Sequence, residues 1–389
     1  MKILHTVEFY SPSFGGMQEV VKQISENLVK RGHDVTVATS KIQSRNFNKL
    51  NGVKIKEFDI KGNYVRGIDG DIGAYVEFVE KGGFDVMTNF AAQQWATDAL
   101  LPVLPKIKPA KVFVPTGFSG FYDPLYKEYF RNLEGWMKNY DMNIFLSEDY
   151  RDINFARKSK ISDKKIKVIP NGASEKEFKK KYKYDFRKEF GISENNFLVI
   201  TVGSHTGLKG HREAIEVFRR AKIKNATLAI IGNSFGGGCT YFCKAIGWLS
   251  KNRLLPGNKI IVPNLTREET VVAYQQADLF LFPSNIECSP IVLFEAGASK
   301  TPFLSSDVGN AEEIAKWTRG GKILPTRKDK SGFSHIEIDK SAQLLKSLVE
   351  DKSLLSKMAK NGYKSWKDRF TWGKISRKYE NIYKKLLSK

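Results

Sequence analysis

The chain has 389 residues, of which 41% are apolar and 12% aromatic. This length accommodates two or three ordinary domains, and the composition is that of a globular protein rather than a disordered one. No apolar run approaches the roughly 18 residues that a membrane-spanning helix requires. Lysine and arginine together number 64 against 42 acidic residues, which gives a net charge of +22.

The positive charge is unevenly distributed along the chain. Residues 1–150 are electrically balanced, whereas the excess falls mainly in residues 151–200 and 351–389. A net charge of this size first suggests nucleic-acid binding. In residues 352–389, however, lysines lie between apolar side chains that recur at helical spacing, which is typical of a helix with a solvated face. We therefore do not expect nucleic acid as a partner, and we leave peripheral contact with an anionic membrane open.

The start of the chain and its cysteine content indicate a reducing compartment. Residues 1–8 form a short apolar run interrupted by His5 and Glu8, which is typical of a strand and not of a secretory signal. Three cysteines cannot form a disulfide framework in a chain of this length. Cys239 and Cys243 have no second cysteine or histidine pair nearby, so we expect no zinc. We expect a cytoplasmic protein, with peripheral attachment to the inner face of the membrane as an option.

Short β-rich runs alternate with helical patterns, which predicts an α/β fold with parallel sheets. A helix after the first strand has Val20, Val21 and Ile24 on one face and ends near Gly32. The predicted strands of the first half are residues 2–7, 34–39, 53–58, 85–88, 111–115, 143–146 and 165–169. Those of the second half are residues 197–202, 226–231, 259–262, 278–282, 302–305 and 322–324.

A change in composition separates the two halves. Pro170-Asn171-Gly172 is followed by a polar, lysine-rich stretch at residues 174–188. We place the domain boundary here, between residues 1–172 and 173–365. The predicted architecture is two doubly wound, Rossmann-like domains that face a cleft, with ligands at the carboxyl ends of the strands.

Two glycine-containing turns each connect a predicted strand to a helix. Gly15-Gly16 follows the first strand, and Gly203 opens a turn that ends at Lys209-Gly210. Glycine lets the backbone approach a ligand closely, and a helix N-terminus favours an anion. Lys209 is therefore a candidate neighbour of a diphosphate, although an ordinary surface lysine in a turn explains it equally well. Neither turn matches a dinucleotide or P-loop motif.

The most specific local signal is a pair of glutamates eight residues apart, Glu287 and Glu295. Ser289 or Pro290 begins a helix between them, and the N–H groups of its first turn are able to hold phosphate oxygens. A carboxylate in an otherwise apolar helix is costly unless it binds something. We interpret Glu287 as facing a sugar and Glu295 as facing a ribose; the alternative is two incidental glutamates at a helix start.

Together these segments resemble the GT-B glycosyltransferases, specifically the large retaining family 4. The resemblance extends over nearly the whole chain, and its motifs are specific only in combination. The matching segments are Gly15-Gly16, residues 28–35, 168–172 and 203–210, the Glu287/Glu295 pair and residues 302–314.

The resemblance implies a division of labour between the domains. Residues 173–365 would bind a nucleotide-diphosphate sugar, and residues 1–172 would bind a hydroxyl acceptor such as a glycan, a lipid-linked sugar or a small molecule. The final segment, residues 366–389, would return to the first domain as a helix. Transfer would retain the anomeric configuration, with no cofactor beyond the donor. Independently of the resemblance, no cluster of His, Asp or Glu in the sequence has metal-ligand spacing, so we expect no metal.

The resemblance also implies a role for individual residues. Glu287 would act on the donor sugar as the catalytic residue, and Glu295 would hold the ribose hydroxyls. The remaining donor contacts, chiefly to the pyrophosphate, would come from Gly15, Gly16, Gly203, His205, Lys209, Ser289, Pro290, Ile291 and Val292.

Two positions depart from the family pattern. Where members usually carry an arginine after the glycine that ends the first strand of the second domain, this chain has Ser204, and His205 is a candidate substitute. Where many carry a histidine after the strand at 111–115, this chain has Thr116, which with Phe118 is an acceptor-side candidate. These departures keep open a degenerate GT-B domain that binds glycan or nucleic acid without catalysis. A phosphorylase or epimerase of the same fold is a second alternative.

Two further segments of the first half invite a functional interpretation. Asp69-Gly70-Asp71 matches the D-x-D string that binds metal and nucleotide in the other glycosyltransferase fold, but we interpret it as a turn. The aromatic-rich stretch at residues 121–140 is suited to docking a lipid or sugar acceptor. A helix packed on its own sheet is the commoner explanation of such a stretch, and we favour it.

Overall fold

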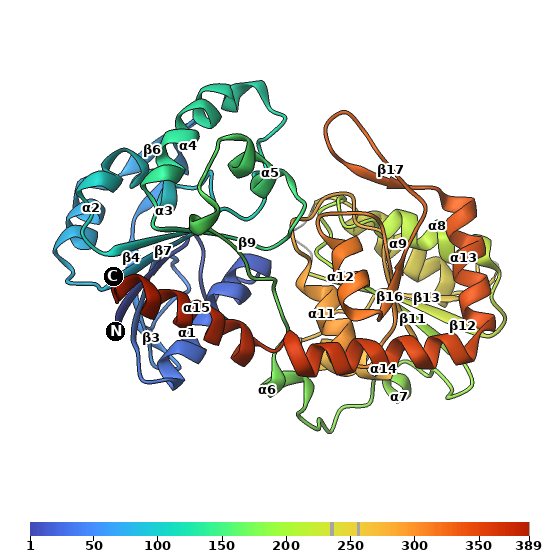
Figure 1. The fold of residues 1–389 in the computed structure, drawn as a ribbon. Coiled ribbons are helices and arrows are strands. Elements are labelled where there is room, and N and C mark those ends of the chain that lie inside the picture. Colours follow the sequence, from blue (N-terminus) through green and yellow to red (C-terminus); the bar gives the residue numbers. More distant parts are fainter. Residues whose placement is uncertain (234–236, 255–256, 389) are drawn as a thin grey trace. The chain divides into compact units, whose positions relative to one another are not determined.

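The structure is a computed structural model that describes residues 1–233, 237–254 and 257–388 (Figure 1). The chain divides into two units, one of Met1–Asn171 with the segment from Trp372 onward, the other of Gly172–Thr371. The predicted boundary between residues 172 and 173 lies beside this division. The last residue of the predicted returning segment, Lys389, lies outside the described residues.

A largely parallel sheet forms the centre of the first unit. Its strands are β1 (Lys2–Thr6), β2 (Asp34–Ser40), β3 (Lys49–Leu50), β4 (Val53–Phe58), β7 (Val86–Phe90), β8 (Ala110–Val114), β9 (Met142–Phe145) and β10 (Ile166–Val168). They are arranged in the order β10-β9-β8-β7-β1-β2-β4-β3, and only the β3–β4 pair is antiparallel. A separate antiparallel hairpin joins β5 (Ile60–Asn63) and β6 (Gly67–Gly70).

The helices of this unit connect its strands, except the last, which follows the second unit in the chain. They are α1 (Gly16–Lys30), α2 (Ile72–Lys81), α3 (Trp95–Asp98), α4 (Lys127–Asn139), α5 (Arg151–Lys158) and α15 (Trp372–Leu387), with 3-10 turns at Leu101–Lys106, Pro124–Tyr126 and Asp163–Lys165. The predicted apolar face of α1 is buried, as expected for an amphipathic helix on a sheet. The helix ends where predicted, because Gly32 has a left-handed φ of 85° and donates its N–H to the carbonyl of Val29.

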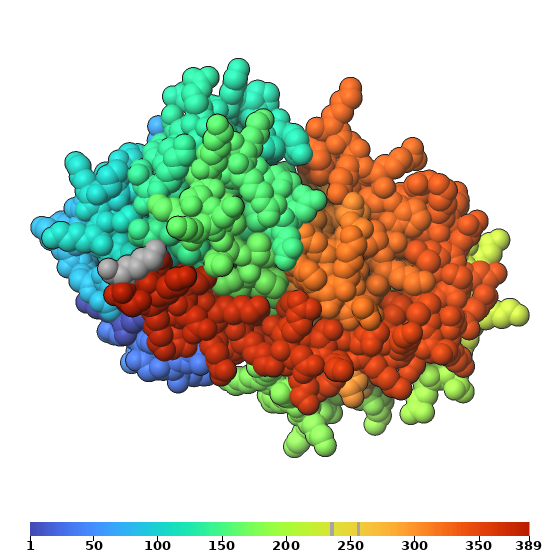
Figure 2. All heavy atoms as spheres, in the orientation of Figure 1, coloured from blue at the N-terminus to red at the C-terminus, as the bar shows by residue number. Residues whose placement is uncertain are grey.

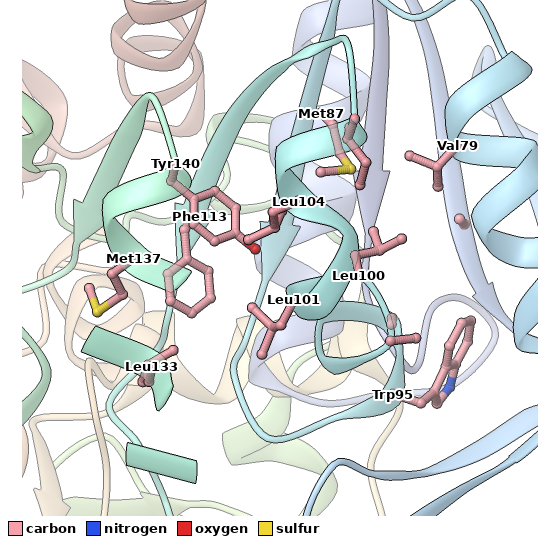
Figure 3. Close-up of a cluster of buried hydrophobic side chains, with 14 of the residues drawn as sticks. Val79, Met87, Trp95, Leu100, Leu101, Leu104, Phe113, Leu133, Met137 and Tyr140 are labelled. Carbon is pink, nitrogen blue, oxygen red and sulfur yellow. The ribbon is translucent and has the colours of Figure 1, made fainter. Parts of the chain in front are cut away.

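Aliphatic and aromatic side chains from several of these elements fill the core of the first unit (Figure 3). The rings of Phe113 on β8 and Tyr140 after α4 are stacked, with centroids 4.8 Å apart. The Tyr140 hydroxyl donates a hydrogen bond to Asn89 at 2.8 Å, so its polar end is satisfied inside the core. Burying one such ring contributes about 1.5–3 kcal/mol. The aromatic segment at 121–140 is therefore anchored mainly by packing, as favoured from the sequence, although Tyr122 and Leu125 are exposed.

The second unit has a parallel sheet of its own. Its strands are β11 (Phe197–Val202), β12 (Ala226–Ile231), β13 (Lys259–Ile261), β14 (Leu279–Phe282), β15 (Phe303–Ser305) and β16 (Gly321–Ile323), arranged in the order β13-β12-β11-β14-β15-β16. A small antiparallel hairpin joins β17 (Thr326–Lys328) and β18 (Ser334–Ile336). The helices are α6 (Glu175–Phe178), α7 (Phe186–Glu189), α8 (His211–Ala221), α9 (Thr240–Lys251), α10 (Arg267–Gln276), α11 (Ile291–Ala298), α12 (Ala311–Thr318), α13 (Ile338–Glu350) and α14 (Lys352–Arg369).

The C-terminal helices explain much of the positive charge. Figure 2 shows α14 at the surface of the second unit. In the first unit α15 packs against α1, where Arg31 and His33 contact Glu380. The lysines of both helices point to solvent, as the amphipathic pattern predicts; they are Lys352, Lys357, Lys360, Lys364, Lys367, Lys374, Lys378, Lys384 and Lys385.

The predicted α/β class with two doubly wound units is confirmed, and each predicted strand has a counterpart in a sheet. One local interpretation is wrong. Asp69 and Gly70 are not a turn but belong to β6, where they pair with Lys61 and Ile60 of β5. Asp71 follows as the N-cap of α2 and accepts a hydrogen bond from the N–H of Ala74.

Candidate active site

Each sheet has a point where the direction of strand succession reverses. In the second unit the chain runs outward from β11 to β13 on one side and from β14 to β16 on the other. Loops at the carboxyl ends of the two strands that flank such a point form the usual ligand site of doubly wound folds. These are the loops after β11 and β14, which carry the predicted residues Gly203 to Lys209 and Glu287 to Val292.

Two glycines bring these loops together. A Cβ on Gly203 would lie 3.0 Å from the Cβ of Lys209, so the lysine stem passes directly over the end of β11. Gly210 has a left-handed φ of 72°, and a Cβ there would lie 2.0 Å from the carbonyl oxygen of Pro283 after β14. The result is an ion pair between the loops, with Lys209 Nζ 2.5 Å from Glu287 Oε1. Both side chains are only partly exposed, at 26% and 16%.

Helix α11 begins four residues after Glu287 in the chain, at Ile291. Pro290 is its N-cap, with extended backbone angles, and makes no side-chain capping bond. Ser289 and Pro290 are buried, whereas Ile291 and Val292 are half-buried. The first N–H groups of any helix lack partners within the helix, so this turn presents donors and the positive end of the helix dipole beside Lys209 and Glu287.

Glu295 lies one turn further along α11 and is 3% exposed. Its Oε1 is 2.5 Å from the guanidinium of Arg267, which also contacts Glu177 Oε2 at 2.8 Å. Because the protein itself supplies a cation to this buried carboxylate, its burial alone does not indicate a bound ligand. Arg267 could not be identified from the sequence. The capping box of Thr266 and Glu269 marks the start of α10, where Arg267 lies, but no sequence pattern near Arg267 indicates that it pairs with Glu295.

His205 belongs to a separate group of buried side chains. It is buried, and its Nδ1 is 3.2 Å from Nδ1 of His211 and 3.5 Å from Sγ of Cys239. Cys243 completes this group, which no local sequence pattern indicates. The premise that no histidine pair lies near the two cysteines therefore fails once the chain is folded.

In the first unit the strand order reverses between β1 and β7. The N–H of Glu8, after β1, donates to Gln94 Oε1, after β7, at 2.9 Å, which ties the two loops together. Gly15 is the N-cap of α1, and Gly15 and Gly16 are both exposed. A Cβ on Gly15 would meet the side chain of Gln18 at 2.4 Å. The two glycines therefore lie in an exposed turn at a helix N-terminus, as predicted.

The loop after β8 contains the acceptor-side candidates and is strained. Thr116, Gly117 and Phe118 have φ values of 60°, 94° and 49°. A β-branched residue rarely adopts positive φ, and such strain clusters at functional sites. The N–H of Gly117 donates to Asp152 Oδ2 at 3.0 Å. Burial raises the pKa of Asp152 to about 6 despite this bond.

The structure treats the two acceptor-side candidates differently. The Phe118 ring is 1% exposed and packs edge-on against Phe130 and Phe155. Its side chain is part of the core, so only its backbone is available to a ligand. Thr116 is half-buried. It remains the better candidate in this loop.

Comparison with known proteins assigns both units to glycosyltransferases. Residues 14–177 match the family described as Glycosyltransferase Family 4, and residues 183–365 match Glycosyl transferases group 1. An uncharacterized glycosyltransferase of Methanocaldococcus jannaschii is 23% identical over 99% of this chain and 98% of its own. The processive diacylglycerol alpha-glucosyltransferase of Acholeplasma laidlawii is 31% identical over 50% of this chain and 52% of its own.

Solved structures share the fold over the whole chain. Sucrose-phosphate synthase from Thermosynechococcus elongatus aligns with a TM-score of 0.78 at 17% identity, covering 100% of this chain and 99% of that one. Anabaena HepE, in complex with UDP, aligns with a TM-score of 0.75 at 16% identity, covering 98% and 99%. Among the described residues, no helix is both long and apolar enough to cross a membrane. With both halves matched, the chain is a family 4-like glycosyltransferase of the GT-B fold.

Proposed function

We propose that the protein transfers a sugar from a nucleotide-diphosphate donor to a hydroxyl acceptor, with retention at the anomeric carbon. The observation that carries the proposal is the meeting of Lys209, Glu287 and the first turn of α11 at the strand-order reversal of the second sheet. A cation and helix N–H donors suit a diphosphate, and a carboxylate suits sugar hydroxyls. HepE, which shares this fold, has been solved with UDP and with UDP-glucose, and this supports a nucleotide sugar as donor.

The donor's arrival redistributes charge in this site. The diphosphate competes with Glu287 for Lys209, and the helix donors at Ile291 and Val292 bind its oxygens. Glu287, released from Lys209, then accepts hydrogen bonds from the donor sugar. Glu295, one turn further along α11, takes the ribose hydroxyls through the carboxylate that Arg267 holds in place.

Lys209 and the first turn of α11 stabilise charge on the departing diphosphate as the glycosidic bond breaks. The acceptor hydroxyl attacks the anomeric carbon from the face that the diphosphate leaves, and its proton passes to a leaving phosphate oxygen. No enzyme nucleophile takes part. Retention rests on the family resemblance. The first unit, with Thr116 in its strained loop, is assigned to the acceptor.

A non-catalytic glycan- or nucleic-acid-binding role is not favoured, because the relatives with which the chain aligns are named as glycosyltransferases. The departures at Ser204 and Thr116 are its only support. They change two side chains and leave the Lys209–Glu287 pair and Glu295 in place.

A thermal-shift screen with UDP-, GDP-, ADP- and dTDP-sugars tests the donor class directly. We expect one nucleotide to raise the melting temperature, and we expect transfer to an acceptor hydroxyl with that donor. Glu295→Ala weakens donor binding, and Glu287→Ala abolishes turnover. Lys340→Met removes a surface lysine at the start of α13 that pairs with Glu337, and it serves as the control. This variant should keep both donor binding and turnover. No shift with any donor, or wild-type hydrolysis and transfer in both glutamate variants, would refute the proposal.

A further inference from the structure

Four side chains with metal-binding atoms meet inside the second unit. They are His205, His211, Cys239 and Cys243, all buried, and their candidate ligand atoms lie within 4.8 Å of one another. They come from two stretches of chain: His205 in the loop after β11 with His211 at the first position of α8, and the two cysteines at the start of α9. The imidazole rings of His205 and His211 are 4.6 Å apart, edge to face.

The backbone holds these two stretches together independently of the side chains. The N–H of Cys239 donates to the carbonyl of His205 at 3.3 Å. Gly238 makes this approach possible, since it has a φ of 60° and a Cβ there would lie 2.1 Å from the same carbonyl oxygen. Cys243 follows one helical turn after Cys239, and its N–H donates to the Cys239 carbonyl at 2.9 Å. Residues four apart share a helix face, so both sulfurs point the same way.

Three distances among these atoms match the edges of a tetrahedron around a zinc ion, and the Cys243 sulfur lies within 4.8 Å of the other three atoms. With bonds of about 2.0–2.1 Å to nitrogen and 2.3 Å to sulfur, a tetrahedral site separates two nitrogens by about 3.4 Å and a nitrogen from a sulfur by about 3.6 Å. The two Nδ1 atoms are 3.2 Å apart. Sγ of Cys239 lies 3.5 Å from Nδ1 of His205 and 3.4 Å from Nδ1 of His211.

We propose that these four side chains form a Cys2His2 site for a divalent metal of the zinc class. Two thiolates and two imidazoles are the donor set that borderline-soft ions prefer, and four protein ligands leave no open position for a substrate. Binding converts both thiols to thiolates and releases two protons per ion, with no change in oxidation state. This is a structural site, separate from the donor chemistry.

The position of the site gives it a consequence for the fold. His205 and His211 flank the turn that carries Lys209, and the two cysteines belong to the start of α9. A bound metal therefore fixes both ends of this turn to α9. Metal removal should therefore lower the local stability of the turn and of the start of α9 and leave the stability of the core of the first unit unchanged.

Metal content and cobalt substitution test the site without any nucleotide sugar, so the outcome does not depend on the proposed function. The full-length protein, reduced and freed of metal with a chelator, is given one equivalent of Zn²⁺ or Co²⁺ and then desalted. We expect about one metal ion per chain by mass spectrometry. With Co²⁺ we expect the absorption of a tetrahedral site with thiolate-to-metal charge transfer.

Variants separate this site from adventitious binding. Cys239→Ser/Cys243→Ser should retain less than a tenth of the metal and lose the charge-transfer band, while Cys288→Ser, which removes the third, partly exposed cysteine, should behave as wild type. Zn²⁺ should raise the melting temperature of wild type and of Cys288→Ser but not of the double variant. His205→Gln, which keeps both thiols, should weaken Zn²⁺ binding at least tenfold.

Three results would overturn the proposal. The first is a reduced wild-type chain that retains no Zn²⁺ or Co²⁺. The second is equal retention by wild type and the double variant. The third is a Cys239–Cys243 disulfide that forms in place of metal binding when the metal-free protein is exposed to Zn²⁺ in air, because it would make the pair a redox couple.

Discussion

Lys209 and Glu287 form a close ion pair, 2.5 Å from Nζ to Oε1, although 78 positions separate them in the chain. Ser284 adds a hydrogen bond to the same Glu287 oxygen at 3.1 Å. Under the proposed function, a donor diphosphate would compete with this carboxylate for one cation.

The first prediction concerns this competition. Glu287→Gln removes the charge that competes for Lys209, so we expect a nucleoside diphosphate to bind more tightly while transfer falls at least 100-fold. Lys209→Met has the opposite effect on binding. A charge-assisted hydrogen bond contributes about 1.5–3 kcal/mol, which corresponds to a loss of roughly 10- to 100-fold in affinity.

Isothermal titration with the diphosphate of the preferred donor measures both effects. Lys340→Met is the matched control, since its ion pair with Glu337 lies at the surface of α13. Equal weakening by Glu287→Gln and Lys209→Met would show that the pair acts as one binding unit and not as competitors.

The second prediction concerns Arg267, which bridges Glu177 and the buried Glu295. Arg267→Met leaves a buried carboxylate without its cation, a change that typically costs about 3–5 kcal/mol. We expect hydrogen exchange in α10 and α11 to accelerate accordingly, and the double variant Arg267→Met/Glu295→Met to recover much of the loss. Lys180→Met, which breaks an exposed pair with Glu268, should cost less than about 1 kcal/mol. A similar small effect of Arg267→Met would mean that Glu295 does not depend on it.

The parallel strands could be predicted from the sequence because most of them are short runs rich in apolar and β-branched residues between turn signals. The short antiparallel strands could not. β3 is only Lys49–Leu50, and β17 (Thr326–Lys328) contains no apolar residue, so neither shows an apolar strand pattern, and their pairing depends on neighbours brought in by the tertiary fold.

The residues of the candidate site also fall into those that the sequence predicts and those that only the tertiary fold brings together. Glu287, Glu295 and the start of α11 are close in sequence and form a recognisable pattern, whereas their partners Lys209 and Arg267 come from other loops and helices. The His205 and Cys239 group is harder still. Each half has an unremarkable spacing, and only the contact of the loop after β11 with the start of α9 creates a four-ligand cluster.

The third prediction is a pH dependence of the first unit. Asp98 is buried and accepts hydrogen bonds from the N–H groups of Tyr64 and Gln93 and from the Tyr129 hydroxyl. Burial raises the pKa of Asp98 from 3.8 to about 6. Between these values the folded chain holds a proton that the unfolded chain has lost, so unfolding free energy falls as pH rises from about 4 to 6 and is level above that.

The comparison of wild type with Asp98→Asn isolates this effect. The stability of wild type relative to the variant should fall by about 2 kcal/mol between pH 4 and 6, and by about 3 kcal/mol over the whole titration, since one pKa unit is worth about 1.4 kcal/mol. Denaturant titrations at a series of pH values measure it. Asp69→Asn, at an exposed position of β6, should show no such trend. A constant difference between wild type and Asp98→Asn across this range would contradict the assigned shift.

The fourth prediction concerns the returning helix α15 and its Tyr383. The Tyr383 hydroxyl lies 2.7 Å from Thr88 Oγ1 and 3.2 Å from His5 Nε2, both inside the first unit. Burial lowers the pKa of His5 to about 3, so its ring stays neutral and relies on hydrogen bonds for its polar atoms. Tyr383→Phe keeps the ring and removes the hydroxyl, which leaves two buried groups short of a partner at a cost of about 1–3 kcal/mol.

Hydrogen exchange should therefore accelerate together in β1, β7 and α15 of Tyr383→Phe, because this hydroxyl is the polar link between them. Tyr122→Phe, which removes an exposed hydroxyl in the same unit, should change exchange by less than about 0.5 kcal/mol. If α15 alone exchanged faster, the helix would be a detachable tail that covers a sheet stable without it. Joint acceleration makes residues from opposite ends of the chain one cooperative unit, as the buried contacts of Tyr383 require.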